Sequence, residues 1–336
     1  MKLSAIIGSL VGLAIVAGLV AMSGFTDIGR AILAAGWGIL AVIALHFPQL
    51  VFSGLAWRSV VPVAQRPPAP VFVGLRLIRE AVNALLPVAQ IGGEFVAARL
   101  MARRGIPLGA ASASLTVDVT LEMLSQVLFT LLGLGLLVMV PQDQQLIRWI
   151  GRGVLVSLAV LAAFVLAQRH GLLRLLESGL LRLARKRKWQ RLEDIAGLHQ
   201  AIVSLYRSPR LLCLGAANHF VSWLLGSLEV MAALFVLGHP VGLRSALIIE
   251  SLGQAFRSLG FAVPGALGVQ EGGLILVCGL LGIGPQGAIE LSLLKRVREL
   301  ALGIPALAAW LWIERRGSAG PAGSPSLKQI CVEKTP

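Results

Sequence analysis

The chain has 336 residues, of which 56% are hydrophobic and only 14% are charged. Soluble domains are typically about 45–50% apolar and about 25% charged, so this composition excludes an ordinary soluble protein. The net charge is +14, but a surface that binds nucleic acid must be soluble and must gather its charge on one exposed face. We therefore expect an all-α, polytopic integral membrane protein with no nucleic-acid partner.

Six stretches are long and apolar enough to be read as membrane-spanning helices. A helix needs about 20 mostly apolar residues to cross the hydrocarbon core of a bilayer. The six predicted spans are residues 3–26, 31–57, 123–142, 153–168, 211–237 and 291–313. The first resembles a signal peptide, but its apolar run is longer than the roughly 7–15 residues of such a signal. We expect it to be retained as a helix.

Basic residues are concentrated in one loop, residues 169–210, which holds ten Lys and Arg against three acids. Basic loops stay in the cytoplasm, so this loop and both termini are predicted to be cytoplasmic. Leucines interleave with its arginines, which fits either an amphipathic helix on anionic headgroups or a solvated connector. The loop separates a first membrane half (1–168) from a second (211–313), and the tail 314–336 is expected to be disordered.

Two segments, 75–94 and 250–273, are too polar for lipid-facing helices and too apolar for loops. Each contains a charged apolar helix, a proline, glycines and a glutamate at the seventh position after the proline. Broken backbone at membrane depth is tolerated only where protein or water satisfies its polar groups, so we expect both segments to line a cavity. Each is either a re-entrant hairpin or a pair of short spans, which gives up to ten membrane segments.

The two broken segments match one another at one fixed offset in residue number, which predicts an internal repeat. Its seven identities are Pro87 with Pro264, Ala89 with Ala266, Glu94 with Glu271, Gly105 with Gly282, Ile106 with Ile283, Ala111 with Ala288, and Glu122 with Glu299. The charge distribution gives the first copy, about 31–140, and the second copy opposite orientations in the membrane. Inverted repeats with interrupted segments are typical of secondary transporters, whose binding sites lie at the repeat interface.

Charged and amide residues in the broken segments are the candidates for binding a substrate. A charge at the bilayer centre costs about 2.5–3.5 kcal/mol on insertion scales, so each needs a partner or a function. The predicted substrate-binding residues are Arg79, Asn83, Glu94, Gln254, Arg257 and Glu271. The arginines suit a phosphate or carboxylate. Alternatively each arginine pairs with the glutamate of its own segment, the glutamates cap helix N-termini, and the amides cap broken helices.

A second group of charges is predicted to form structural ion pairs. Asp118 and Glu122 share a helix face, as do Lys295 and Glu299. We expect the first two to pair across the halves with the basic cluster. The predicted set is Asp118, Glu122, Lys295, Arg296, Arg298 and Glu299. Proton coupling through the acids is the alternative.

Three further polar residues, His46, His219 and Glu229, lie in predicted spans without visible partners. In membrane helices such residues form interhelical hydrogen bonds more often than proton relays.

The sequence lacks the motifs of the common enzyme classes. It contains no Walker-type phosphate loop, no Gly-x-Ser-x-Gly elbow and no His-Glu-x-x-His motif. Its cysteines, Cys213, Cys278 and Cys331, are too far apart for metal-ligand or redox spacing. We therefore expect no metal, no cofactor and no enzymatic activity.

The first broken segment carries a recognisable motif. Between residues 79 and 99 it contains an Arg-Glu pair, Asn83, Pro87 and a Gly-Gly-Glu triplet ending at Glu94. Gly105, Ala111, Ser112 and Asp118 follow it. This run resembles the flippase-like family that includes the transmembrane region of lysylphosphatidylglycerol synthases. The run 257–273 is similar to the branch of that family associated with hopanoid biosynthesis.

The resemblance extends from the first span to about Trp312. It implies a protein of the bacterial inner membrane that moves an amphiphilic lipid, either a hopanoid or a phospholipid, with lipid-synthesis or export proteins as partners. Only the short tail 314–336 follows the last predicted span, so no aminoacyl-transferase domain is expected. Two other functions stay open. One is a lipid-modifying enzyme with Glu94 or Glu271 as general base, and the other is a scaffold for hopanoid enzymes that docks through the 169–210 loop.

Overall fold

The computed structural model describes residues 33, 35–61, 66–86, 92–139, 198–260, 266 and 268–318. Within these residues the chain forms α-helices and no strand. The helices are α3 (Gly38–Val60), α4 (Ala69–Leu85), α5 (Gly92–Ala102), α6 (Leu108–Val138), α9 (Leu198–Tyr206), α10 (Pro209–Val236), α11 (Leu243–Leu259), α12 (Val269–Leu280) and α13 (Pro285–Ser318). The all-α class is confirmed.

Three of the described helices, α3, α6 and α10, are long and apolar enough to cross a membrane. They contain or overlap the predicted spans 31–57, 123–142 and 211–237. The spans at 3–26 and 153–168, most of the 169–210 loop and the tail from 319 lie outside the described residues.

Two predicted span boundaries are wrong. Helix α6 begins at Leu108 rather than at 123, and α13 begins at Pro285 rather than at 291. A count of charge-free residues stops at Glu122 in α6 and at Glu290 in α13. Helix α6 continues through Asp118 and Glu122 because both bind arginines of α4, which removes most of the penalty of burying them.

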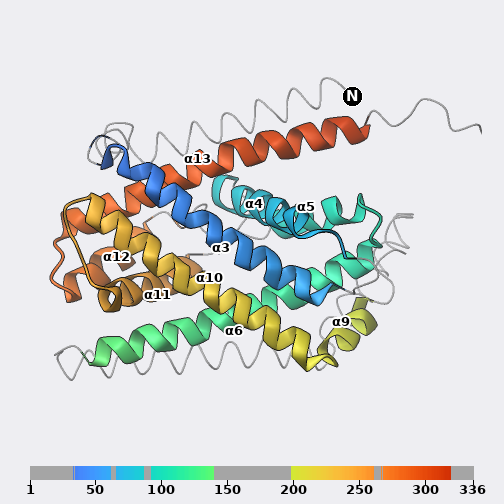
Figure 1. Cartoon of the computed structure of the whole chain (residues 1–336), viewed down its shortest axis with the longest axis horizontal. Coiled ribbons are helices and arrows are strands. Elements are labelled where there is room, and N and C mark those ends of the chain that lie inside the picture. The colour runs from blue at the N-terminus through green and yellow to red at the C-terminus, as the bar shows by residue number, and fades with distance from the viewer. Residues whose placement is uncertain are drawn as a thin grey trace, which may run out of the picture.

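Helices α3 and α10 lie side by side through the middle of the molecule, with α13 along one edge and α6 along the other (Figure 1). They are antiparallel. A Cβ atom on Gly38 would contact Val236, and near the other end Ser59 donates a hydrogen bond to the carbonyl of Leu211 at 3.3 Å. Residues from the two halves therefore face one another along this whole interface.

The predicted broken segments form two pairs of helices, α4 with α5 and α11 with α12, at opposite ends of the α3–α10 pair (Figure 1). In the second pair Gly253 faces Leu274 while Gly260 faces Val269, so the two helices are antiparallel. Helices α5 and α12 have 11 and 12 residues, which gives lengths of roughly 16–18 Å at about 1.5 Å per residue. Neither can cross a hydrocarbon core of about 30 Å by itself.

The order α3–α4–α5–α6 recurs as α10–α11–α12–α13. Helices α5 and α6 begin at Gly92 and Leu108, and the offset that relates the two broken segments carries these positions onto Val269 and Pro285, where α12 and α13 begin. Packing follows the same correspondence, because α4 contacts α13 and its counterpart α11 contacts α6.

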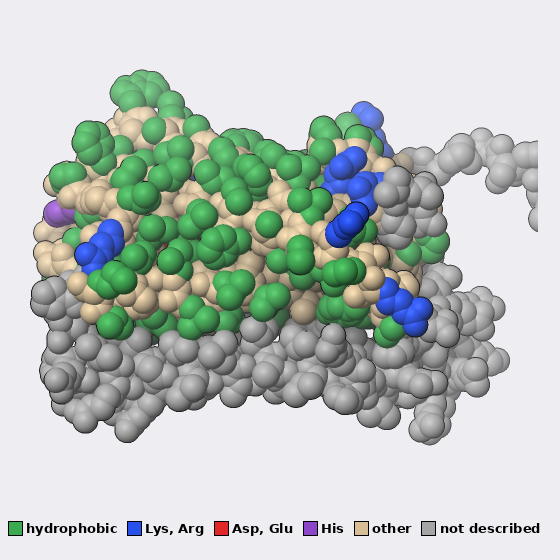
Figure 2. All heavy atoms as spheres, turned by 60° about the horizontal axis from the view of Figure 1, so that its bottom comes forward, with side chains coloured by type: hydrophobic (Ala, Val, Ile, Leu, Met, Phe, Trp, Pro, Cys, Tyr) green, Lys and Arg blue, Asp and Glu red, His purple; other side chains and the backbone are tan. Residues whose placement is uncertain are grey.

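Two apolar clusters stabilise the fold, one centred on α4, α5 and α6 and the other on α10, α11, α12 and α13. In the first, the rings of Trp57 and Phe72 pack edge to face at 5.4 Å. The outer surface is also apolar. Leu124, Leu128 and Leu132 are exposed at successive turns of α6, and on the face in Figure 2 basic side chains gather only toward the two ends. An apolar exterior around buried charges is typical of a membrane protein.

Candidate functional site

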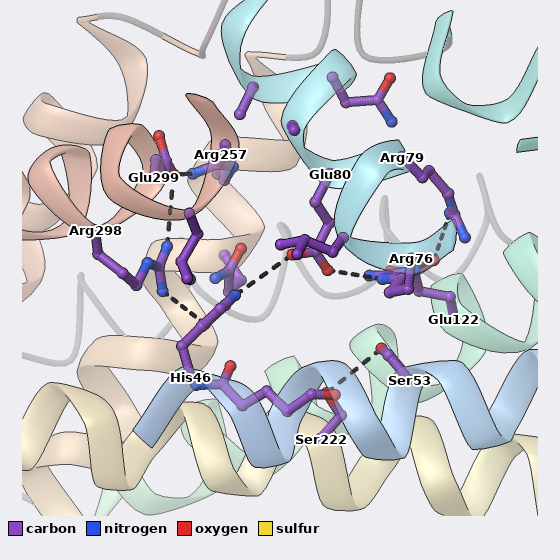
Figure 3. Close-up of a pocket in the computed structure, with 18 of the residues that line it drawn as sticks. His46, Ser53, Arg76, Arg79, Glu80, Glu122, Ser222, Arg257, Arg298 and Glu299 are labelled. Carbon is purple, nitrogen blue, oxygen red and sulfur yellow. Dashed lines mark hydrogen bonds and ion pairs between the residues drawn. The ribbon is translucent and has the colours of Figure 1, made fainter. Parts of the chain in front are cut away.

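A polar cavity of about 240 Å³ lies at the centre of the bundle, between the two apolar clusters. Six helices line it: α3, α4 and α6 from the first half, and α10, α11 and α13 from the second. Its ionisable lining residues are His46, Arg76, Arg79, Glu80, Glu122, Arg257, Arg298 and Glu299, most of them visible in Figure 3. Amides and hydroxyls complete the wall. Such an arrangement can surround a polar group without exposing it to lipid tails.

Arg79 is the centre of the charge network in the first half. Its side chain is 6% exposed and binds three carboxylates: Glu94 at 2.8 Å, Asp118 at 3.1 Å and Glu122 at 2.7 Å. The predicted ion pair between Arg79 and Glu94 is therefore present. Because three carboxylates occupy its guanidinium group, Arg79 fixes α5 and α6 against α4.

Arg76 lies one turn before Arg79 on the same face of α4. It binds both oxygens of Glu122, at 2.9 and 2.5 Å, and one oxygen of Glu80 at 2.7 Å. The two-point contact with Glu122 is the geometry in which a guanidinium group holds a carboxylate most strongly. Glu80 is the more accessible partner, with 34% of its side chain exposed.

Asn83 positions the start of α5. Its amide nitrogen lies 3.2 Å from both carboxylate oxygens of Glu94, and its amide oxygen accepts the backbone N–H of Gly93 at 2.8 Å. Asn83 lines the cavity, whereas Glu94 does not. Glu94 was predicted to bind substrate. In the structure it binds two residues of the cavity wall, Arg79 and Asn83, and does not itself line the cavity.

The second half differs from the prediction in its pairing. Arg257 binds Glu299, together with Gln270 at 3.1 Å, rather than Glu271. Glu271 instead accepts the backbone N–H of Gly268 at 2.7 Å and pairs with Arg296 at 3.3 Å. It thus caps α12, as one of the two sequence interpretations proposed.

Two predicted substrate-binding residues of the second half, Gln254 and Arg257, line the cavity. Gln254 donates a hydrogen bond to Glu250 at 2.8 Å. Glu271 does not line the cavity. Of the six predicted residues, the four on α4 and α11 line the cavity. Glu94 at the start of α5 binds two of them, Arg79 and Asn83, whereas Glu271 at the start of α12 caps that helix.

The predicted pairing of acids and bases across the two halves is wrong. Asp118 contacts Arg79 and His219, whereas Lys295 pairs with Glu250 and Arg298 pairs with Glu229. The residues predicted to form ion pairs all form them, but with other partners. Helices α6 and α13 lie at opposite edges of the bundle (Figure 1), so their side chains are neutralised locally.

A cluster around Glu229 connects the two halves. This carboxylate is buried. It accepts hydrogen bonds from Gln49 at 2.6 Å and Arg298 at 2.5 Å, and it lies 3.0 Å from Nδ1 of His46. His46 therefore has the interhelical hydrogen bond expected of it. His219 has one as well, to Asp118 at 2.9 Å.

The sequence did not identify Glu229, His46 and Gln49 as one site. One signal was available, because His46 and Gln49 are three positions apart and so share a helix face.

Asp118, Glu122 and His219 place their ligand atoms within 4.8 Å of one another, which is close enough to hold a metal ion. Arg79 already contacts both carboxylates, and Arg76 contacts that of Glu122. A cation would have to compete with two guanidinium groups, so the donor set fits an ion-pair cluster better than a metal site.

The comparisons with known proteins agree with this architecture. A family model described as the lysylphosphatidylglycerol synthase TM region matches residues 9–306, which include all the described helices from α3 into α13. No curated protein and no solved structure matches the chain. The matching family is a membrane domain associated with lipid handling and flippase-like function. The chain therefore belongs to the lysylphosphatidylglycerol synthase TM region family.

Proposed function

We propose that the protein translocates a membrane lipid and that the central cavity binds the lipid headgroup during transfer. The observation that carries this proposal is the cavity itself, which has four guanidinium groups and three carboxylates in its wall and an apolar exterior around it. Charges inside a membrane protein mark the paths of polar substrates. A headgroup could enter this wall while its acyl chains stay in the bilayer.

The cavity lies between halves that we propose form an inverted repeat. Helix α3 packs antiparallel to α10, the helix that occupies the same place in the second half. Two equivalent helices that run antiparallel are related by an axis perpendicular to them, which lies in the membrane plane when they span it. In this proposal α4–α5 and α11–α12 are re-entrant hairpins. Transporters of this class expose a central site to each side in turn.

The cavity residues differ in how much of each side chain is exposed, and we propose different roles for them on that basis. Arg257 and Glu80 have 21% and 34% of their side chains exposed, and with Asn83 and Gln254 they are the groups that we propose contact the headgroup. Arg79 is largely neutralised by its three carboxylates and is assigned a structural role.

Two kinds of lipid fit this wall. A phospholipid offers a phosphate to Arg257, a contact in which guanidinium groups excel. A hopanoid with a polyol side chain offers hydroxyls to Asn83, Gln126 and Gln254, and the resemblance to the hopanoid branch makes it a candidate cargo. We place the protein in the bacterial inner membrane with both termini cytoplasmic, in contact with lipid-synthesis or export proteins. The proposal includes no chemical step.

Lipid distribution in cells distinguishes transport from the alternatives. We expect Glu94→Gln and Glu271→Gln to weaken complementation of a strain that lacks the gene. Glu94 binds the cavity residues Arg79 and Asn83, and Glu271 binds Arg296, which pairs with the cavity residue Glu299. Lipids would be quantified separately in the inner and outer membranes. Unchanged total lipid with an altered distribution supports transport, whereas a missing lipid species indicates a lipid-modifying enzyme.

Two other outcomes count against this assignment. Wild-type distribution in both variants would contradict the positioning roles of Glu94 and Glu271. Loss of a hopanoid in the deletion strain, restored by a chain with a blocked cavity, would instead indicate a scaffold.

A further inference from the structure

His46 lies where the charge networks of the two halves meet. Its ring lines the cavity and its side chain is 13% exposed. Nδ1 lies 3.0 Å from Glu229 on α10 and 3.0 Å from Arg298 on α13, and Nε2 lies 3.4 Å from Glu80 on α4. Figure 3 shows the ring between the Arg298 side and the Glu80 side of the cavity. Its own helix contributes Gln49, which is hydrogen-bonded to Glu229.

The two contacts of Nδ1 require opposite protonation states. When Nδ1 carries a hydrogen it donates to Glu229, and Arg298 cannot donate to it. When Nδ1 is bare it accepts an N–H from Arg298, and its lone pair is repelled by the Glu229 carboxylate. Nε2 faces the Glu80 carboxylate and must carry a hydrogen to donate to it. With Nε2–H in place, a hydrogen on Nδ1 makes the ring an imidazolium ion that suits Glu229, and a bare Nδ1 leaves it neutral and suits Arg298. Histidine is the side chain whose ordinary titration, near about pH 6.5, allows both states at physiological pH.

The net charge of the buried network also favours a protonated His46. Among the described residues, the charge networks of the two halves contain six cationic side chains and eight carboxylates. The carboxylates are Glu80, Glu94, Asp118, Glu122, Glu229, Glu250, Glu271 and Glu299. The cations are Arg76, Arg79, Arg257, Lys295, Arg296 and Arg298. The network also contains two histidines, His46 and His219, each in contact with a carboxylate. A proton on His46 would reduce this excess of negative charge by one.

Only one of these rings is placed to exchange its proton during transport. His219 is 1% exposed and contacts Asp118 away from the cavity wall. His46 borders the cavity and joins helices of both halves. We infer that His46 binds the coupling proton of this protein, so that lipid movement through the cavity is driven by a proton gradient. This inference rests on the proposed function.

Protonation would change which helices the ring connects. The imidazolium ion donates from Nδ1 to Glu229 and from Nε2 to Glu80, which ties α3 to both α10 and α4. In the neutral ring with a bare Nδ1, that atom accepts from Arg298 while Nε2 still donates to Glu80. The ring then loses its hydrogen bond to Glu229 on α10, and its attraction to Glu80 is weaker because it no longer carries a positive charge. Glu80 is an accessible wall residue, so proton binding and headgroup binding act on the same group.

The test uses the full chain in vesicles of phosphatidylcholine and phosphatidylglycerol with a trace of NBD-labelled phosphatidylglycerol. Dithionite reduction reports the label in the outer leaflet, valinomycin with potassium clamps the membrane potential, and trapped pyranine reports proton movement. We expect a one-unit pH gradient to change the initial rate of transfer at least threefold. One proton per lipid permits up to about tenfold accumulation, the factor that corresponds to one pH unit. His46→Gln should reduce the rate ratio to near one.

His219→Gln is the matched control, because it replaces a buried histidine outside the cavity and should retain the gradient dependence. Should His46→Gln fail to fold, Glu80→Gln leaves the ring in place and removes one carboxylate that favours its charged form. That variant should shift the midpoint of the rate-against-pH profile to lower pH. A gradient-independent rate in wild type, a preserved ratio in His46→Gln or an unchanged midpoint in Glu80→Gln overturns the inference. Absence of phosphatidylglycerol transfer under every condition overturns the proposed function for phospholipids as well.

Discussion

Replacement of Arg79 by leucine is expected to destabilise the protein by about 3–5 kcal/mol, the usual effect of removing one partner from a buried ion pair. The substitution leaves Asp118, fully buried, with His219 as its remaining partner, and removes a cation from Glu94 and Glu122. The protein loses stability because these carboxylates would then be buried without the cation that balances their charge. Unfolding of the purified chain in detergent, by heat or by SDS titration, measures the loss.

Three further variants define the origin of this effect. Arg79→Lys keeps the charge but lacks the planar fork that reaches three carboxylates, so we expect an intermediate loss. Adding Asp118→Asn to Arg79→Leu should restore part of the stability, because one unpaired carboxylate is removed. Arg244→Leu is the control. Arg244 is exposed and donates to the backbone carbonyl of Leu136, so the change should stay within about 0.5 kcal/mol. Equal losses at 79 and 244 would contradict the central role of Arg79.

Filling the cavity should abolish transfer without changing any charge. Ala84 lies on α4 and lines the cavity of about 240 Å³, so Ala84→Phe places a phenyl ring where we propose the headgroup binds. We expect the transfer rate of labelled lipid in vesicles to fall at least about tenfold, equivalent to about 1.4 kcal/mol.

The control for this variant lies on the same helix. A Cβ atom at Gly74 meets nothing within 4 Å, so Gly74→Phe adds the same ring to the outer face of α4 and should transfer lipid at the wild-type rate. Similar rates in Ala84→Phe and wild type would show that the cavity is not on the transfer route. A loss common to both variants would indicate damage to α4 rather than a blocked site.

The sequence predicted helices well where charged residues are few. Helices α3 and α10 coincide closely with apolar runs, because charges such as Glu229 in α10 interrupt them only singly. The prediction failed at the start of α6, whose early turns carry Asp118 and Glu122. A count of apolar residues treats each charge as seeking water, whereas both side chains here bind arginines of α4.

The candidate site was predicted in outline but not in its pairing. Arg79, Asn83, Gln254 and Arg257 were identified because they lie in polar segments among apolar ones, and the structure brings all four to one cavity. Their partners depend on how six helices rotate against one another, which no single segment encodes. Arg76 and Glu80 could have been found, because their spacing places them on the same face of α4 as Arg79 and Asn83.

The Glu229 cluster shows a different limit. His46 and Glu229 lie far apart in the sequence, and each appears alone within an apolar helix. Only the antiparallel packing of α3 on α10 brings them together. A solitary polar residue in a predicted span therefore indicates that a partner exists without indicating where it lies.

The central claim, that the cavity between the two halves binds the lipid headgroup, is tested most directly by photocrosslinking. A phospholipid with a diazirine on its headgroup would be reconstituted with the full chain, irradiated and mapped by mass spectrometry of the labelled peptides. We predict labels on the cavity faces of α4, α11 and α13, near Asn83, Gln254 and Leu302, and competition by unlabelled lipid. Labels confined to the outer ends of the helices, with none on these faces, would contradict the account.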